Sequence, residues 1–133
     1  MTDSEEKELL STAKIIAVVG LSTNPAKDSY RVAEYLLQQG YRIIPVNPAA
    51  ETILGQECKP SLAAISEPVD IVDVFRRPED ALKVAQECAE TGLKTVWYQL
   101  GTISPDDAAK AREMGLELVT DVCIMREHRR LFA

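Results

Sequence analysis

The chain alternates short apolar runs with amphipathic stretches along its whole length. The first run, residues 15–19, reads Ile-Ile-Ala-Val-Val; it carries no charge, and Gly20 ends it. Continuous runs rich in β-branched residues are typical of strands buried on both faces of a parallel sheet. Because amphipathic stretches separate the runs, the pattern predicts an α/β fold in which strands and helices alternate.

Five strands and their connecting helices can be placed from this alternation. Apolar side chains at helical spacing after Asp28, followed by Gly40 as a C-terminal cap, predict a helix over residues 28–39. Ser104 is predicted to be the N-cap of a later helix. The predicted strands are residues 15–19, 42–46, 69–75, 95–98 and 116–119, and the other predicted helices are 60–65, 78–92, 105–115 and 121–131. Right-handed crossovers favour a three-layer, doubly wound fold with a mostly parallel five-stranded sheet.

Length and composition limit the function. A chain of 133 residues is expected to form one domain, residues 1–133. Its formal net charge of −6 argues against nucleic acid and anionic membrane surfaces as partners. Cys58, Cys88 and Cys123 are far apart, so neither a zinc site nor a disulfide framework is expected. Scattered thiols and an acidic N-terminus unlike a signal peptide predict a cytoplasmic protein.

The segments that follow the strands form the candidate site, because doubly wound sheets bind ligands at the carboxyl ends of their strands. Residues 20–29 follow the first strand, where backbone N–H groups and the positive end of a helix dipole attract phosphate. Gly20 permits a tight turn there. The loop also offers hydroxyl donors and one cation, namely Ser22, Thr23, Ser29 and Lys27. The alternative is a plain polar connection in which Asp28 or Ser29 caps the helix.

Two features separate this loop from the usual dinucleotide-binding motif. G-x-G-x-x-G requires glycine where this chain has Ser22 and Pro25, and the ending of a P-loop is missing as well. The second strand leads into Asn47-Pro48 without the Asp or Glu that usually binds the ribose hydroxyls of NAD. The stiff, partly apolar turn between Pro45 and Pro48 is better suited to covering an adenine ring.

These segments resemble, in the same order, those of the small stand-alone CoA-binding proteins, which are similar to the N-terminal domain of the succinyl-CoA synthetase α subunit. The likeness extends over nearly the whole chain. It rests on residues 18–29, 40–48, 69–78, 96–101 and 123–128. Each segment alone is weak evidence, but five in sequence are specific. The resemblance implies a Rossmann-like domain that binds coenzyme A or an acyl-CoA.

By position, the resemblance also implies the residues of the site. Gly20, Ser22, Thr23, Asn24, Lys27 and Ser29 would line the pyrophosphate, and Val46, Asn47 and Pro48 would flank the adenosine. Phe75, Arg76 and Arg77 would form the wall after the third strand, and Gln99 and Gly101 would lie near the pantetheine. Ala49 and Ala50 stand where members of the family often have a lysine. The contact with the 3′-phosphate is therefore left to Arg42, Arg76 or Arg77.

The other reactive residue types receive structural interpretations. His128, the only histidine, lies in a basic final turn that complements the helix dipole, with the adjacent glutamate as its ion-pair partner. Cys123 and Trp97 are interpreted as core residues. Asp70 and Asp73 lie three apart on a strand and so face opposite sides. Asp70 is expected to begin the strand, and Asp73 to make a structural hydrogen bond. No catalytic residue is predicted.

The sequence favours a CoA-binding module without catalysis of its own. One alternative is a small NAD(P)-binding oxidoreductase, which rests on the fold alone. Another is a subunit that supplies bound CoA to a separate, acyl-CoA synthetase-like chain, because the related synthetases contain further domains. Lys27, Arg76 and Arg77 are predicted to form a local positive site for a polyanionic ligand on an otherwise acidic body.

Overall fold

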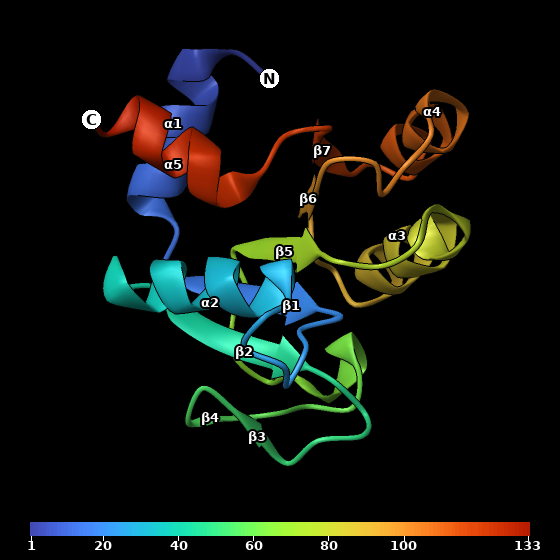
Figure 1. Ribbon diagram of the computed structural model, residues 1–133. Helices are drawn as coiled ribbons and strands as arrows, with labels where there is room; N and C mark the ends of the chain where they lie inside the picture. Colours follow the sequence, from blue (N-terminus) through green and yellow to red (C-terminus); the bar gives the residue numbers. More distant parts are fainter.

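Five parallel strands form the sheet of the computed structural model, which describes residues 1–133 (Figure 1). They are β1 (Ile15–Val19), β2 (Arg42–Val46), β5 (Ile71–Val74), β6 (Thr95–Tyr98) and β7 (Glu117–Thr120). Their order in the sheet is β2-β1-β5-β6-β7, and each neighbouring pair is parallel. The prediction of a doubly wound, five-stranded parallel sheet is therefore confirmed, and no strand of this sheet is antiparallel.

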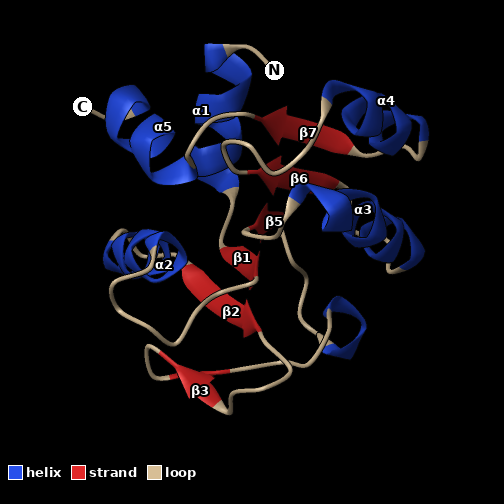
Figure 2. Cartoon of the chain, turned by 45° about the vertical axis from the view of Figure 1, so that its right-hand side comes forward, coloured by secondary structure: helices blue, strands red, loops and turns tan.

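Helices cover both faces of the sheet and complete the three layers (Figure 2). α1 (Asp3–Thr12), α2 (Asp28–Gln38) and α5 (Ile124–Leu131) lie on one face, and α3 (Ala81–Glu90) and α4 (Pro105–Glu113) lie on the other. Successive strand residues point to opposite faces. Ile16 and Val18 therefore pack beneath α2 and α5, while Ala17 and Val19 pack beneath α3 and α4. None of the helices has the length and apolar character that crossing a membrane requires.

Three predicted boundaries move by a few residues. The strand predicted over 69–75 spans Ile71–Val74, and the helix predicted over 78–92 begins as the short 3₁₀ turn η2 (Pro78–Asp80) before α3. The last helix begins at Ile124 instead of residue 121, because Asp121 adopts a φ of 60° that no helix allows. The next carbonyl oxygen, that of Val122, accepts a hydrogen bond of 3.0 Å from the buried Trp97 indole. This bond ties the segment between β7 and α5 to the sheet.

A small hairpin between β2 and β5 was not predicted. It pairs β3 (Thr52–Ile53) with β4 (Gln56–Glu57), antiparallel. Its turn includes Leu54 at a φ of 53°, a conformation that leucine rarely adopts. Because leucine stands where such turns usually have Asn or Asp before Gly, the sequence carried no sign of a hairpin. The helix predicted over residues 60–65 is a single 3₁₀ turn, η1 (Leu62–Ala64).

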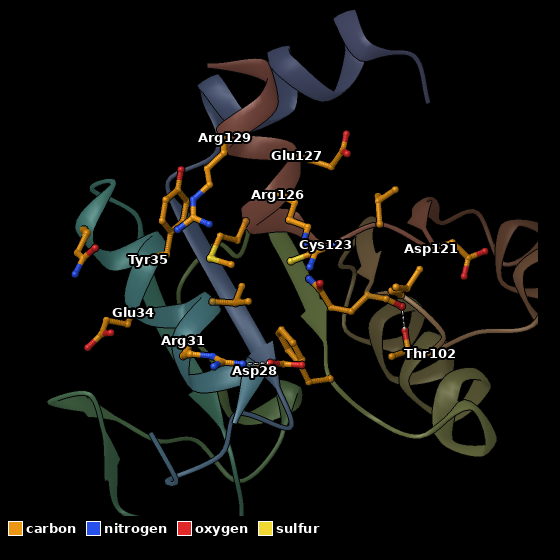
Figure 3. Close-up of a pocket in the computed structure, with 17 residues that line it drawn as sticks. Asp28, Arg31, Glu34, Tyr35, Thr102, Asp121, Cys123, Arg126, Glu127 and Arg129 are labelled. Carbon is orange, nitrogen blue, oxygen red and sulfur yellow. Dashed lines mark hydrogen bonds and ion pairs between the residues drawn. The ribbon is translucent and has the colours of Figure 1, made fainter. Parts of the chain in front are cut away.

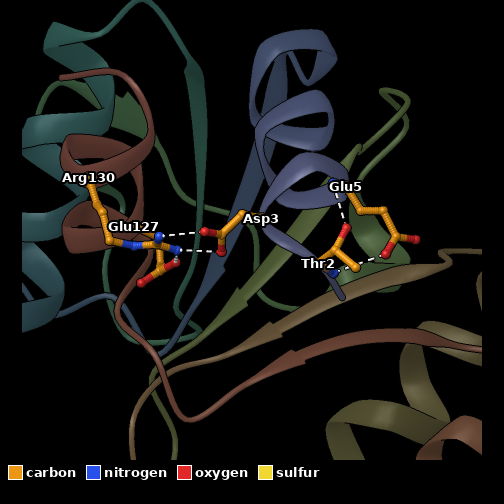
Figure 4. A network of polar contacts seen from close by, with 5 residues as sticks. All are labelled: Thr2, Asp3, Glu5, Glu127 and Arg130. Atoms are coloured by element: carbon orange, nitrogen blue, oxygen red, sulfur yellow. Dashed lines mark hydrogen bonds and ion pairs between the residues drawn. The ribbon is translucent and has the colours of Figure 1, made fainter.

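The N-terminal helix α1 was also not predicted. Thr2 and Glu5 form a capping box at its start, each side chain bonding to the other residue's backbone N–H (Figure 4). The Arg130 guanidinium of α5 binds the Asp3 carboxylate through two hydrogen bonds of 2.8 and 2.9 Å and also binds Glu127. These contacts hold the two ends of the chain side by side.

Gly20 marks the place where the direction of strand order reverses. The chain leaves β1, adds β2 on one side, and returns to add β5 on the other. Gly20 follows β1 with a φ of +86°, and a Cβ atom placed there would lie 2.3 Å from the Phe75 carbonyl oxygen. Its N–H donates to the Val46 carbonyl at 3.3 Å. Only a residue without a side chain fits between the ends of β2 and β5.

The cost of a side chain at Gly20, beside the Phe75 carbonyl oxygen, can be measured by comparing alanine substitutions at two glycines. Gly20→Ala and Gly40→Ala both place a side chain at positive φ, which costs about 1–2 kcal/mol. Nothing lies within 4 Å of a Cβ at Gly40, so only Gly20→Ala adds a clash. We expect Gly20→Ala to lower the free energy of unfolding in urea clearly more than Gly40→Ala does. Equal losses of unfolding free energy in the two variants would show that the backbone around Gly20 shifts to admit the Cβ without a further cost.

Candidate functional site

The carboxyl ends of the strands meet at one edge of the sheet, and a crevice opens there between β1 and β5. Doubly wound sheets bind ligands at this reversal of strand order. A cavity of about 330 Å³ is lined by Gly20, Phe75, Arg76, Arg77 and Asp80. All of these except Asp80 belong to the predicted site. The fold thus brings the loop after β1 and the residues after β5 to one cavity.

The charges at this crevice are partly balanced. Arg76 Nη2 lies 3.5 Å from Asp80 Oδ2, and Arg77 Nε lies 3.2 Å from Glu79 Oε1. Lys27 is exposed and makes no ion pair. The Arg77–Glu79 pair is exposed and contributes little stability, so Arg77 can exchange this carboxylate for a phosphate, whereas Asp80 Oδ2 beside Arg76 is buried. Arg76 and Arg77 of the predicted positive site line this cavity beside two acidic neighbours that sequence reasoning left out, whereas Lys27 does not line it.

Most polar side chains of the loop between β1 and α2 are used within the loop itself. The N–H of Ser22 donates to Ser29 Oγ, the N–H of Asn24 to Ser22 Oγ, and the N–H of Ala26 to Asn24 Oδ1, each at 3.0 Å. Ser29 is buried, whereas Thr23 and Lys27 are exposed. These bonds fix the shape of the loop, so its remaining ligand-facing donors are backbone N–H groups and exposed side chains.

The helix caps expected in the alternative interpretation of this loop, Asp28 or Ser29, are wrong. Lys27 is the N-cap residue of α2, and no side chain caps the helix. The Ser29 hydroxyl binds Ser22 instead, and the Asp28 carboxylate pairs with Arg31. The first turn of α2 therefore keeps backbone N–H groups that no side chain satisfies, as an anion site requires.

The turn after β2 is held against the same loop. Asn47 Nδ2 donates to the Leu21 carbonyl at 3.1 Å, and Asn47 Oδ1 accepts from the N–H of Ala49 at 2.8 Å. Val46 is buried and Pro48 is exposed. Asn47 thus joins the ends of β1 and β2, and the exposed surface it leaves for a ligand is that of Pro48 and its neighbours.

Arg42 lies at the wrong end of the sheet for the 3′-phosphate. It is the first residue of β2, and its backbone N–H bonds to the Lys14 carbonyl before β1. Its guanidinium binds Glu67. The expectation that Arg42 replaces the lysine missing at Ala49 and Ala50 is therefore corrected, which leaves Arg76 and Arg77 on the ligand side.

A larger cleft of about 930 Å³ lies between α2 and α5 (Figure 3). Its walls carry charged and aromatic side chains that sequence reasoning missed: Asp28, Arg31, Glu34 and Tyr35 from α2, and Asp121, Arg126, Glu127 and Arg129 from the segment after β7. The Arg129 guanidinium lies 4.8 Å from the centre of the Tyr35 ring. The only sequence signal for the α2 wall is the helical spacing of its polar residues. Phe75 lines both cavities, so the cleft adjoins the crevice.

Gln99 lines this cleft, but Gly101 does not. Gln99 is 5% exposed, and its amide nitrogen donates to a carboxylate oxygen of Asp73, which is fully buried. Burial raises the pKa of Asp73 to about 7, although the hydrogen bond from Gln99 acts in the opposite direction. Gly101 lies outside, in a turn that the Thr102 N–H closes onto the Gln99 carbonyl at 3.0 Å. The structural hydrogen bond expected of Asp73 is confirmed, and its altered ionisation was missed.

The remaining reactive side chains are held by their neighbours. His128 is 9% exposed, its Nδ1 lies 2.7 Å from the Tyr35 hydroxyl, and burial lowers its pKa. Glu127 pairs with Arg130 and not with the histidine beside it, so that expectation is wrong.

Cys123 is half-buried, and it lines the cleft as well as packing on the core. Asp70 accepts from the N–H groups of Lys14 and Ile15 at the amino edge, as expected of a strand-starting residue.

Comparison with known proteins connects this arrangement to coenzyme A. The uncharacterized protein YneT of Bacillus subtilis (strain 168) is 41% identical over 125 residues, 94% of this chain and 93% of that protein. Acetate–CoA ligase (ADP-forming) II of Archaeoglobus fulgidus is 35% identical over 83 residues. Those residues are 61% of this chain but only 12% of the ligase.

Solved structures and a family model point the same way. A hypothetical protein from Pyrococcus horikoshii OT3 superimposes with a TM-score of 0.94 at 39% identity, covering 100% of this chain and 94% of that one. The model of the CoA binding domain family matches residues 14–129. This range includes every residue that lines the two cavities. The chain therefore belongs to the CoA-binding domain family, as its strand-end segments indicated.

Proposed function

We propose that the chain binds coenzyme A, or an acyl derivative of it, across the carboxyl edge of the sheet, without catalysing a reaction itself. The observation that carries this proposal is the crevice at the reversal of strand order, where Gly20 touches the end of β5 and Arg76 and Arg77 line the same cavity. A phosphate there would meet the backbone at Gly20 and two guanidinium groups. Membership of the CoA-binding domain family supports the choice of ligand.

The ligand is proposed to lie along the strand ends. Its pyrophosphate would bind the loop that contains Thr23 and Lys27, and its adenosine would lie against Val46, Asn47 and Pro48. The pantetheine arm would then cross the ends of β5 and β6 toward Gln99. Because Phe75 lines both cavities, this path runs from the small crevice into the larger cleft without leaving the protein surface.

The absence of catalysis is proposed from the state of the candidate groups. A cysteine nucleophile needs an adjacent base. The single histidine is buried, bonded to Tyr35, and has a lowered pKa. Cys123 lines the cleft, but no hydrogen bond joins its thiol to this histidine. We propose that residues 1–133 act as one CoA-binding unit, in the cytoplasm that the scattered thiols indicate.

Two lysines at opposite edges of the sheet test where the phosphates bind. Lys27 lies in the loop after β1, and Lys14 lies before β1; both are exposed. We expect Lys27→Ala to weaken CoA binding about ten-fold, because a charge-assisted contact is lost. Lys14→Ala should leave the dissociation constant unchanged. Isothermal titration calorimetry measures both, and equal affinities of the two variants would place the phosphates away from this loop.

The same calorimetry separates this function from a dinucleotide-binding one. NAD should bind far more weakly than CoA, because no carboxylate follows β2 and Asn47 is already bonded to Leu21. Acetyl-CoA should bind and be recovered intact, with no free thiol released on prolonged incubation. Preferential binding of NAD would contradict the CoA proposal, and release of CoA from acetyl-CoA would contradict the proposed lack of catalysis.

A second candidate function comes from the ligase relatives. The Archaeoglobus ligase contains a similar segment within a much longer chain, so a separate copy of this unit is suited to present CoA to another protein. In that case the chain, tagged and purified from its native cell extract, should bring one catalytic chain with it in constant ratio. Recovery of the chain alone, with CoA bound, would favour the simple binding function.

A further inference from the structure

Asp73 and Gln99 form an isolated polar pair beneath the floor of the cleft between α2 and α5. Asp73 lies within β5 between Val18 of β1 and Trp97 of β6, and it is fully buried. Its only hydrogen bond comes from Gln99 Nε2 to Oδ1, and its second oxygen, Oδ2, has no partner. A buried carboxylate with one neutral donor is costly, so the pair is not explained by stability.

The direction of this hydrogen bond fixes the orientation of the Gln99 amide. An ionised carboxylate only accepts hydrogen bonds, so the amide must turn its nitrogen toward Asp73. Gln99 Oε1 then points the other way. This oxygen accepts no hydrogen bond within the protein, yet it is not completely buried. It is therefore accessible from the cleft that Gln99 lines.

We propose that Asp73 is a positioning residue, which holds the Gln99 side chain so that the floor of the cleft accepts a hydrogen bond from an N–H group of the ligand. This inference rests on the proposed function, since the pantetheine arm of CoA carries two amide N–H groups that suit such an acceptor. An aspartate that never touches the ligand would thereby set the hydrogen-bond polarity of its site.

Protonation of Asp73 would reverse this polarity. With its pKa raised to about 7 by burial, Asp73 gains a proton as the pH falls through neutrality. Oδ1, the oxygen that faces Gln99, can then carry the proton and donate it to Gln99 Oε1 once the amide has rotated. The amide nitrogen would then face the cleft, and a ligand N–H would meet a donor instead of an acceptor.

Other ionisable groups face the cleft or lie behind its walls. From α2 these are Asp28, Arg31, Glu34 and Tyr35, and from the β7–α5 segment they are Asp121, Cys123, Arg126, Glu127 and Arg129. His128 lies behind Tyr35, and Glu6 of α1, whose pKa is raised to about 7 chiefly by burial, lies under α5. All of these remain in Asp73→Asn, so the difference between that variant and the wild type isolates Asp73.

Nuclear magnetic resonance of the ligand-free protein tests the positioning directly. We expect the Asp73 carboxyl ¹³C signal and the Gln99 side-chain amide signal to titrate with one common midpoint. Asp73→Asn identifies the first signal, and Gln99→Met identifies the second by removing it. In Asp73→Asn the Gln99 signal should no longer titrate with that midpoint. A Gln99 side-chain amide signal that does not shift as Asp73 ionises in the wild type would overturn the proposal.

Calorimetry with dephospho-CoA tests the consequence for binding. This ligand lacks the 3′-phosphate, whose second ionisation near pH 6 would obscure the effect. From pH 8 to pH 6, wild-type affinity should fall about five-fold, as expected for the loss of one neutral hydrogen bond. Asp73→Asn should lose most of this pH dependence, and Gln99→Met should bind weakly at both pH values.

Asp70→Asn is the matched control. Asp70 lies just before the same strand, but its carboxylate binds backbone N–H groups at the opposite edge of the sheet. Its variant should keep the wild-type pH profile. Identical profiles for the wild type and Asp73→Asn, or full affinity in Gln99→Met, would overturn the inference. If no CoA derivative binds at all, the proposed function fails, while the resonance experiment still decides whether Asp73 orients Gln99.

Discussion

The contact between Gly20 and the Phe75 carbonyl oxygen is the constraint on which the site depends. A sheet that adds strands on both sides of β1 must let the chain pass over the ends of its neighbours. Here the passage is so close that no Cβ fits. The same closeness leaves a crevice with exposed backbone, and the strand that follows supplies Arg76 and Arg77 at its rim. The topology and the proposed anion site therefore have one physical cause.

Hydrogen bonds within the loops then decide which side chains remain for a ligand. Ser22, Asn24 and Ser29 satisfy backbone N–H groups of their own loop, and Asn47 joins that loop to the end of β2. Residue types that suggest ligand binding in the sequence act here first as structural supports. A loop fixed by its own side chains loses less conformational entropy when a ligand binds, so such bonds favour binding indirectly.

The parts predicted from sequence are those governed by local pattern. Strands buried on both faces must be continuously apolar, which made β1 and the other central strands recognisable. α1 has no such apolar run: the Thr2 and Glu5 spacing of its capping box was overlooked, and its contact with Arg130 far along the chain depends on tertiary packing. The burial of Asp73 likewise depends on which helices pack on the sheet. The cleft between α2 and α5 was missed for the same reason.

Asp73 shows why such a residue is informative. A leucine or valine in the same strand position would avoid desolvating a carboxylate, and replacing buried ionic groups by apolar ones is often neutral or stabilising. An apolar side chain, however, cannot choose between the two orientations of a neighbouring amide. A carboxylate makes that choice because it accepts and does not donate. The cost of burying Asp73 is therefore best understood together with the orientation of the Gln99 amide, whose oxygen is the proposed acceptor for a ligand N–H.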